Sequence, residues 1–113
     1  MTDDYTPKYV QRGALAFLRW IHDKPLVAAS SFSPQTVDRV VDTLLNFLPD
    51  EKAKTIFVLY FGLFDGKQLG TYFISQELGV PPIIATYQMA CQTINLRNRF
   101  PQKALETLLS ESS

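Results

Sequence analysis

Apolar residues recur at spacings of three and four along most of the chain, which is the pattern of amphipathic helices. Residues 9–23 carry this spacing and predict a first helix. A second helix is predicted to begin at Ser33-Pro34, because a serine hydroxyl caps the first N–H groups and a proline fits the first helical position. The residues expected on the buried faces are Val10, Ala14, Phe17, Leu18 and Ile21 in the first helix and Val37, Val40, Val41, Leu44 and Leu48 in the second.

A third helix is predicted from Pro49-Asp50-Glu51 to Tyr60 or Phe61. Its start has a proline in the first turn and carboxylates beside the positive end of the helix dipole. Residues 55–64 are rich in β-branched and aromatic side chains and would suit a buried strand by propensity alone. A lone strand would leave its backbone groups unpaired in a small helical domain, so helix is favoured.

Glycine and proline divide the rest of the chain into three more helices. A short helix over 69–78 is predicted to end at Gly79, which can adopt positive φ. Val80-Pro81-Pro82 then opens a longer helix that extends to about Arg99, and Phe100-Pro101 separates it from a final short helix. The apolar residues of that last helix are Ala104, Leu105, Leu108 and Leu109.

The predicted architecture is therefore all-α, an irregular six-helix bundle that contains a helix-turn-helix. A chain of 113 residues has room for one hydrophobic core, and no Gly/Ser-rich linker divides it. We expect a single domain over residues 1–113, with an N-terminal helical pair over 1–48 and a helix-turn-helix-like part over 49–113.

Charge is balanced over the chain, with eleven Lys and Arg against eleven Asp and Glu. This balance removes the positive field that usually covers a nucleic-acid-binding domain. In the second helix, Asp38, Arg39 and Asp42 are interpreted as a solvated face. The stretch from Leu78 to Leu96 has no charge at all, but its prolines, threonines and amides do not suit a bilayer core.

The N-terminus is acidic and polar, unlike a signal peptide, and a single cysteine fits a reducing compartment. We therefore expect a cytoplasmic protein with no membrane partner.

No catalytic or metal-binding motif stands out in the sequence. One cysteine and one histidine cannot form a tetrahedral zinc site without carboxylates or a second chain. We expect His22 to be a capping or surface histidine and Cys91 to be a small buried hydrophobic residue. Asp65-Gly66-Lys67 is interpreted as a polar turn, because the phosphate-loop pattern is absent. Neither enzyme activity nor a cofactor is expected.

Fourteen large aromatic residues are more than one small core easily encloses. Aromatic side chains supply much of the energy of protein interfaces. Some of them are therefore expected at an interface, and a homodimer is one alternative that this leaves open. The candidates are Tyr60, Phe64, Tyr72, Phe73 and Tyr87.

Residues 59–80 have the sequence LYFGLFDGKQLGTYFISQELGV, and Pro49–Lys52 precedes them. This segment resembles region 4 of the bacterial primary sigma-factor family, in which a Leu-Arg-Phe-Gly-Leu turn precedes a loop, a short helix and a Phe-Gly-Val or Leu-Gly-Val turn. Pro49–Lys52 lies where that family has a Pro-Arg-Glu helix start, and the likeness covers about residues 49–99. The matching turn residues are Leu59, Phe61, Gly62, Leu63, Leu78, Gly79 and Val80.

The resemblance implies a non-enzymatic, transcription-associated protein that contacts promoter DNA or RNA polymerase. After the second turn the family has a Thr-Arg-Glu-Arg-type stretch, whereas this chain has Pro-Pro-Ile-Ile-Ala-Thr-Tyr. Because no Lys or Arg precedes Arg97 on that helix, a protein partner is favoured over DNA. The expected protein-contacting residues are Ile83, Ile84, Tyr87 and Tyr72, and the DNA-contacting residues, should DNA be bound, are Thr86, Gln88, Gln92, Arg97 and Arg99.

Ile84, Tyr87, Cys91 and Ile94 form an apolar stripe along the longer helix at spacings of three, four and three. If this stripe is buried, the outer face of the helix is small, apolar and uncharged, which suits contact with protein. A second interpretation stays open, in which the chain is an all-α adaptor or a homo-oligomeric interaction module with no DNA role.

Overall fold

The structure is a computed structural model that describes residues 5–21 and 32–111. These residues form six helices and no strand, which confirms the all-α prediction, including the helix over the strand-like segment that begins at Thr55. The helices are α1 (Gln11–Ile21), α2 (Pro34–Phe47), α3 (Glu51–Phe61), α4 (Thr71–Leu78), α5 (Pro82–Arg99) and α6 (Gln102–Glu111).

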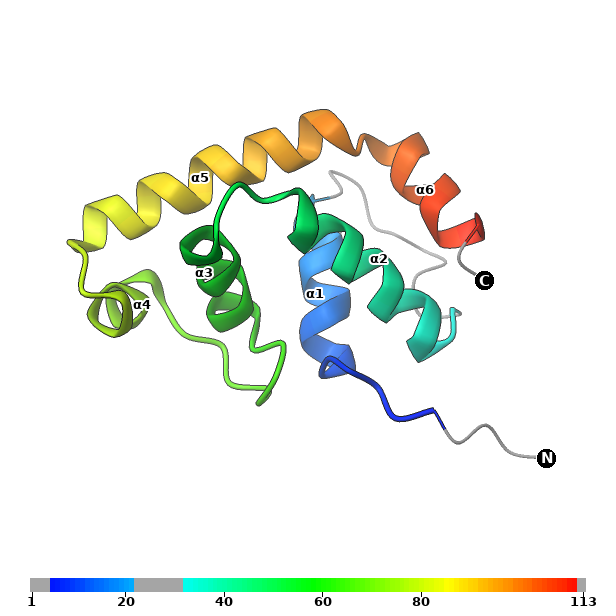
Figure 1. The fold of residues 1–113 in the computed structure, drawn as a ribbon, viewed down its shortest axis with the longest axis horizontal. Coiled ribbons are helices and arrows are strands. Elements are labelled where there is room, and N and C mark those ends of the chain that lie inside the picture. The colour runs from blue at the N-terminus through cyan, green and yellow to red at the C-terminus, as the bar shows by residue number, and fades with distance from the viewer. Residues whose placement is uncertain (1–4, 22–31, 112–113) are drawn as a thin grey trace.

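The longest helix, α5, runs along the length of the molecule across one side of the bundle (Figure 1). It runs from α4 at one end of the molecule to α6 at the other, and α1 and α3 pack beneath it. Helix α2 packs on α1 and on α6. One side of α5 therefore faces the bundle, and the opposite side faces outward.

Local signals set the ends of the helices. The Ser33 hydroxyl accepts a hydrogen bond from the Thr36 N–H at 3.2 Å, and Asp50 caps α3 by accepting from the Ala53 N–H at 2.8 Å. Gly62 closes α3 with a φ of 62°. Because Asp50 is the cap, α3 begins at Glu51, and Pro49 precedes its first turn instead of lying in it as predicted.

Two predicted helix starts were wrong by two residues. Helix α1 begins at Gln11 rather than Tyr9, and α4 begins at Thr71 rather than Leu69. The backbone N–H groups of Val10 and Leu69 bond to the carbonyls of Leu63 and Leu59, so these segments are tied to α3 and its closing turn instead of being helical. The prediction of a helix end at Asp23 lies outside the described residues.

The predicted faces of α1 and α2 form the core. All of their expected residues are buried except Val10, which precedes α1 and is half-buried. Phe17 packs between Phe57 and Phe61 of α3, with ring centroids 5.4 and 5.1 Å apart. In α6, Leu105 and Leu109 are buried, and the remaining two apolar residues are half-buried.

Helix α1 approaches the end of α3 more closely than a side chain would allow. A Cβ atom at Gly13 would lie 2.3 Å from the carbonyl oxygen of Phe61 and 3.0 Å from that of Gly62. The Arg12 guanidinium donates to the Gly66 carbonyl at 3.1 Å, just beyond that contact. The absence of a side chain at Gly13 therefore lets α1 rest on the turn that closes α3.

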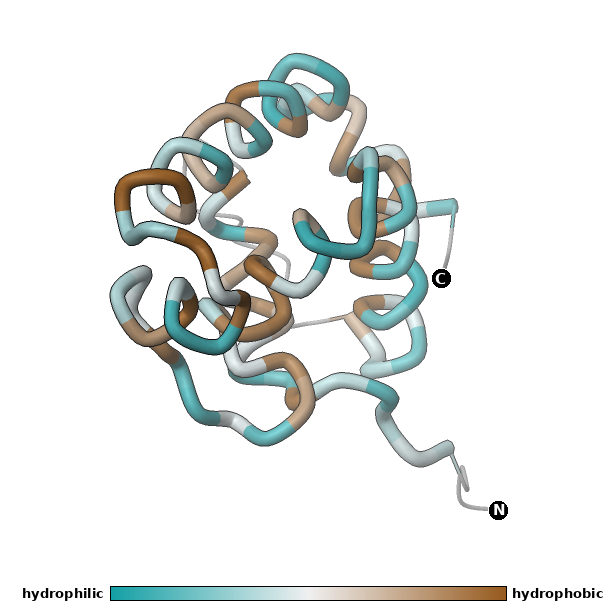
Figure 2. Tube along the Cα trace, turned by 60° about the vertical axis from the view of Figure 1, so that its left-hand side comes forward, coloured by the Kyte–Doolittle hydropathy of each residue, from teal (hydrophilic) through white to brown (hydrophobic). Residues whose placement is uncertain are grey.

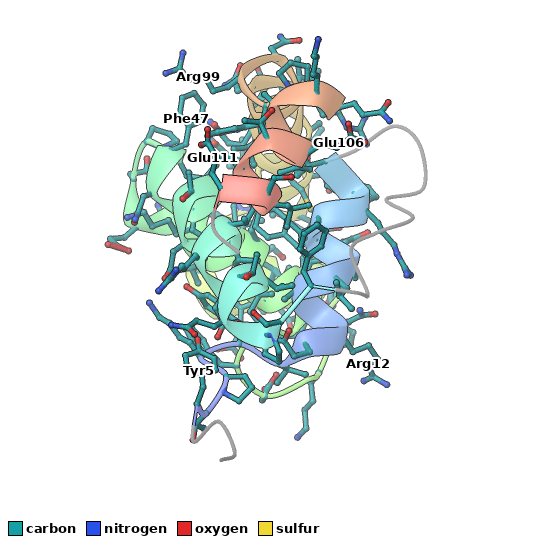
Figure 3. All side chains as sticks on the ribbon, turned by 90° about the vertical axis from the view of Figure 1, so that its right-hand side faces the viewer. Tyr5, Arg12, Phe47, Arg99, Glu106 and Glu111 are labelled. Carbon is teal, nitrogen blue, oxygen red and sulfur yellow. The ribbon has the colours of Figure 1, made fainter. Side chains whose placement is uncertain are left out.

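Asp38 is not part of a solvated face, as the sequence had suggested, but is 2% exposed. It accepts hydrogen bonds from the Tyr5 hydroxyl, from the Lys8 N–H at 2.7 Å and from the Gln11 side chain at 3.1 Å. The segment before α1 folds back on α2 and covers the carboxylate, and Figure 3 shows Tyr5 on the side where α2 begins. These donors satisfy a charge whose burial would otherwise be costly.

The neighbouring residues of the same predicted face differ from Asp38. Asp42 is half-buried and accepts hydrogen bonds from the Tyr9 hydroxyl and from the Lys8 ammonium group at 3.0 Å. Only Arg39 is exposed as expected.

Replacing Gly13 with alanine should destabilise the protein by about 1–3 kcal/mol, because the new methyl group overlaps a backbone carbonyl that cannot move aside like a side chain. Urea unfolding followed by circular dichroism measures this change. Gly70→Ala is the matched control, since a Cβ at Gly70 meets nothing within 4 Å, and it should cost less than about 1 kcal/mol. Equal losses in the two variants would contradict the close approach of α1 to α3.

Stability should fall in alkaline solution through Tyr9. Burial, and the hydrogen bond that Tyr9 donates to Asp42, raise the pKa of its hydroxyl well above the ordinary value of 10.0. The native state therefore keeps a proton that the unfolded chain loses. The contribution of Tyr9 to the free energy of unfolding is thus complete below about pH 10 and declines by about 1.4 kcal/mol per pH unit above it.

The variant Tyr9→Phe should lose less stability than the wild type above about pH 10, as measured by urea unfolding at a series of pH values. Tyr72→Phe is the control, because Tyr72 is exposed on α4. The same alkaline slope in wild type and Tyr9→Phe would show that the Tyr9–Asp42 pair does not produce the effect.

Candidate interaction surface

A three-residue turn sets the direction of α5 relative to α4. Gly79 adopts a φ of 67°, and the Val80 N–H donates to the Ser75 carbonyl at 3.0 Å, which closes α4. Pro81 and Pro82 then start α5, where a proline costs no helical hydrogen bond. The turn residues singled out from the sequence thus produce a helix, a sharp turn and a second helix.

The inner face of α5 consists of Ala85, Met89, Thr93 and Leu96, all of which are buried. Its outer face consists of Ile83, Ile84, Tyr87, Cys91 and Ile94. Exposed fractions on this outer face are 74% for Ile83, 63% for Tyr87, 57% for Ile94 and 42% for Ile84. Burial of the stripe Ile84, Tyr87, Cys91 and Ile94 is therefore contradicted.

The physical reason is that α5 carries two sets of residues at helical spacing. The inner set is smaller on average, and it is held toward the bundle by the hydrogen bond between Thr93 and the indole of Trp20, whose ring lies against Tyr60 and Phe61 of α3. The larger set is therefore turned outward. Figure 2 shows the first turn of α5 in brown, the colour of hydrophobic residues, at the surface of the bundle.

Trp20 fixes this orientation of α5. Its indole N–H donates to the Thr93 hydroxyl at 2.8 Å, and its backbone carbonyl accepts from two nitrogens of the Arg97 guanidinium at 3.1 and 2.6 Å. The same guanidinium lies 5.8 Å from the centroid of the indole ring, within cation–π range. Rotating α5 to bury its outer face would break all of these contacts.

The residues proposed for DNA contact lie on two opposite flanks of α5, because a helix turns by about 100° per residue. Thr86 and Arg97 share one flank, on the side of Trp20. Gln88, Gln92 and Arg99 share the other.

Most of these DNA candidates are not available as an exposed polar surface. Gln88, Gln92 and Arg97 are half-buried, and Arg97 is engaged with Trp20. Arg99 is exposed, but its guanidinium lies 5.7 Å from the centroid of the Phe47 ring. Figure 3 shows Arg99 and Phe47 near one another. The set therefore does not converge on one face.

Helix α4 adds two exposed aromatic rings, Tyr72 and Phe73, whose centroids are 5.5 Å apart in an edge-to-face arrangement. Of the aromatic residues expected at an interface, Phe64 and Tyr87 are also exposed, whereas Tyr60 is half-buried against Trp20. All four residues proposed for protein contact, Ile83, Ile84, Tyr87 and Tyr72, are on the surface.

A groove of about 260 Å³ runs beside the inner flank of α5. It is mostly apolar and lies between α1, α3, α4 and α5. Its lining residues are Trp20, Tyr60, Thr71, Thr86, Met89 and Ala90. The rings of Trp20 and Tyr60 form one wall, with centroids 5.7 Å apart.

The titratable residues add little to the chemistry of this surface. Cys91 is half-buried rather than buried as predicted, and a hydrogen bond with its side chain raises the pKa of Tyr87, one turn earlier.

Within 5–21 and 32–111, no group of His, Cys, Asp and Glu could hold a metal ion. In the same ranges, no helix is long and apolar enough to cross a membrane. His22 lies outside the described residues.

Asp65-Gly66-Lys67 is the polar turn that the sequence predicts. The Asp65 side chain accepts a hydrogen bond from the Lys67 N–H at 2.8 Å, and Gly66 has a φ of 76°. This turn has a local structural role, which leaves the exposed residues of α4 and α5 as the candidate site.

No protein-family model, curated protein or solved structure matches this chain. The likeness to sigma region 4 rests on the residues of 49–99 themselves and stays a prediction.

The sequence did not reveal that Trp20 anchors α5 or that Ile94 is exposed. The spacing from Ile84 to Ile94 shows that both share a helix face, but spacing alone does not say whether that face points inward. The presence of small residues at the alternative positions Ala85 and Thr93 was the available signal, since small side chains let a helix pack closely.

Replacing Thr93 with valine should remove the acceptor of the Trp20 indole N–H while keeping the side-chain shape. The free energy of unfolding should fall by about 0.5–1.5 kcal/mol. The fluorescence emission maximum of Trp20 should also shift, because its indole loses a hydrogen-bond partner, and the signal is unambiguous since Trp20 is the only tryptophan in the chain. Fluorescence-detected urea unfolding measures both quantities.

Thr107→Val, on α6, is the matched control and should leave the emission of Trp20 unchanged. Unchanged emission and stability in Thr93→Val would show that this hydrogen bond does not hold α5 in place.

Proposed function

We propose that this chain is a non-enzymatic, transcription-associated protein whose sigma region 4-like helix-turn-helix contacts RNA polymerase through the outer face of α5. The observation that carries the proposal is the exposed, uncharged and apolar character of that face. The link to transcription comes from the resemblance of residues 49–99 to sigma region 4.

The composition of the outer face favours a protein partner. Single exposed apolar residues are ordinary, but here Ile83, Tyr87 and Ile94 are each more than half exposed on one side of one helix. The cores of protein interfaces are depleted in charged residues and enriched in aromatic ones, and this face fits both tendencies. Tyr87 and the α4 ring of Tyr72 are the type of residue that dominates binding energy.

The same face does not suit duplex DNA. Affinity for DNA comes largely from lysine and arginine contacts to phosphate, and α5 has neither before Arg97. Arg97 already donates to the Trp20 carbonyl, and Arg99 lies over Phe47. A helix with this surface has few means to neutralise phosphates or to read base edges.

The variants Ile83→Asp and Tyr87→Ala should each weaken binding to purified bacterial core RNA polymerase by more than tenfold, which is about 1.4 kcal/mol. Biolayer interferometry with immobilised polymerase measures this change. Phe64→Ala is the matched control, because Phe64 is 62% exposed, like Tyr87, but lies outside α4 and α5.

Three results would contradict the proposal. Absence of binding between the wild-type protein and the polymerase would refute the proposed role in transcription. If Phe64→Ala and the two α5 variants bind the polymerase with the same affinity, the contact does not involve the outer face of α5. Binding to duplex DNA at low salt, with a steep salt dependence and loss in Arg99→Ala, would assign the helix to DNA instead.

A further inference from the structure

We propose that a second copy of this chain occupies the outer face of α5, so that two α5 helices pack antiparallel about a two-fold axis. The inference goes beyond the proposed function and shares with it only the assignment of this face to protein contact. It names a second partner for the face and a specific register.

The spacing on the outer face is that of a coiled-coil seam. Ile84, Tyr87, Cys91 and Ile94 are separated by three, four and three residues, which matches the a and d positions of a heptad repeat. Helix α5 has 18 residues and lies along the long axis of the molecule (Figure 1). The exposed fractions of Ile84, Tyr87 and Ile94 show that this seam faces outward. No described helix covers the seam, since its large residues are exposed.

Antiparallel packing gives each seam residue a partner of suitable size. With the two-fold axis crossing the seam halfway between Tyr87 and Cys91, Ile84 lies opposite the partner's Ile94, and Tyr87 lies opposite the partner's Cys91. Isoleucine thus meets isoleucine, and the large ring meets the smallest seam residue. Because the interface is isologous, each of these contacts occurs twice.

Charge is compatible with this register. The chain has no charged residue from Leu78 to Leu96, so the two seams bring no like charges together. Beyond the seam, the end of α5 that carries Arg99 comes beside the partner's turn between α4 and α5. The nearest charged residue before that turn is Glu77, which is exposed and of opposite sign.

The available area fits a weak but specific dimer. An aromatic side chain carries about 150–250 Å² of surface, and a similar scale for isoleucine gives roughly 500 Å² per copy for the exposed parts of Tyr87, Ile83, Ile84 and Ile94. The total of about 1,000 Å² lies at the low end of specific interfaces. We therefore expect a reversible dimer with a dissociation constant in the micromolar range.

Sedimentation velocity over a concentration series should show this monomer–dimer equilibrium in the wild type. Ile94→Asp should raise the dissociation constant more than tenfold, because it places a charge in the apolar seam twice per dimer. Ile94 is 57% exposed in the single chain, so the variant should fold normally, as circular dichroism will show. Phe64→Asp, an equally exposed site away from the seam, should dimerise like the wild type.

Disulfide trapping tests the register. In a Cys91→Ser background, the double variant Ile84→Cys, Ile94→Cys should form covalent dimers on mild oxidation, because the two positions meet across the axis. The single variants should not, since like positions lie about 15 Å apart along the antiparallel helices. Efficient trapping through either single variant would overturn the antiparallel arrangement, and a wild type that stays monomeric at high concentration would overturn the dimer.

The outcomes for this dimer and for the proposed function can be separated. A monomer that binds polymerase through α5 would refute the dimer and leave the function intact. A dimer of the stated register that does not bind polymerase would support the dimer and refute the function. Because both partners use one face, polymerase and the second copy should compete for α5.

Discussion

The orientation of α5 depends on one residue, Trp20. Its indole extends from α1 toward α3 and α5, donates to Thr93 and lies beside the Tyr60 ring in a tilted arrangement, while its backbone carbonyl accepts from Arg97. These contacts hold Thr93 and Arg97 toward α1, so the side of α5 that carries Thr93 faces the bundle. The larger apolar residues of the helix therefore face outward and give the candidate surface its apolar character.

The rest of the bundle provides a firm base for this arrangement. Gly13 lets α1 rest on the closing turn of α3, which places Trp20 near the end of α1 beside Tyr60. On the other side, the segment before α1 is tied to α2 through Asp38. These contacts join residues that are far apart in sequence, so α1 is held at both sides and presents Trp20 to α5.

The sequence predicted what local chemistry controls. The Ser33 and Asp50 caps and the Gly62 and Gly79 helix ends depend on neighbouring residues, and helix limits near them were correct within about two residues. The faces of α1 and α2 were also predicted, because each has one clear apolar stripe.

Features that depend on tertiary contacts were not predictable in the same way. Asp38 has the composition of a surface residue, and its burial comes from a segment 30 residues earlier in the chain. On α5, two sets of residues have helical spacing, and the choice between them is made by Trp20 and not by α5 itself. The candidate residues Ile83 and Tyr87 were found, but the reason for their exposure was not.

The most direct test of this account is the solvent exposure of the six isoleucines, measured by NMR as relaxation of their labelled methyl groups by a soluble gadolinium chelate. The Tyr87→Ala variant should be used, because it removes the largest exposed side chain of the proposed contact face and is expected to weaken contacts of α5 with a partner. We expect strong relaxation at Ile83, Ile84 and Ile94 and weak relaxation at the buried residues Ile21, Ile56 and Ile74. Protection of Ile84 and Ile94 in the monomeric variant would mean that this face of α5 is turned inward, which would contradict the orientation on which the proposed surface depends.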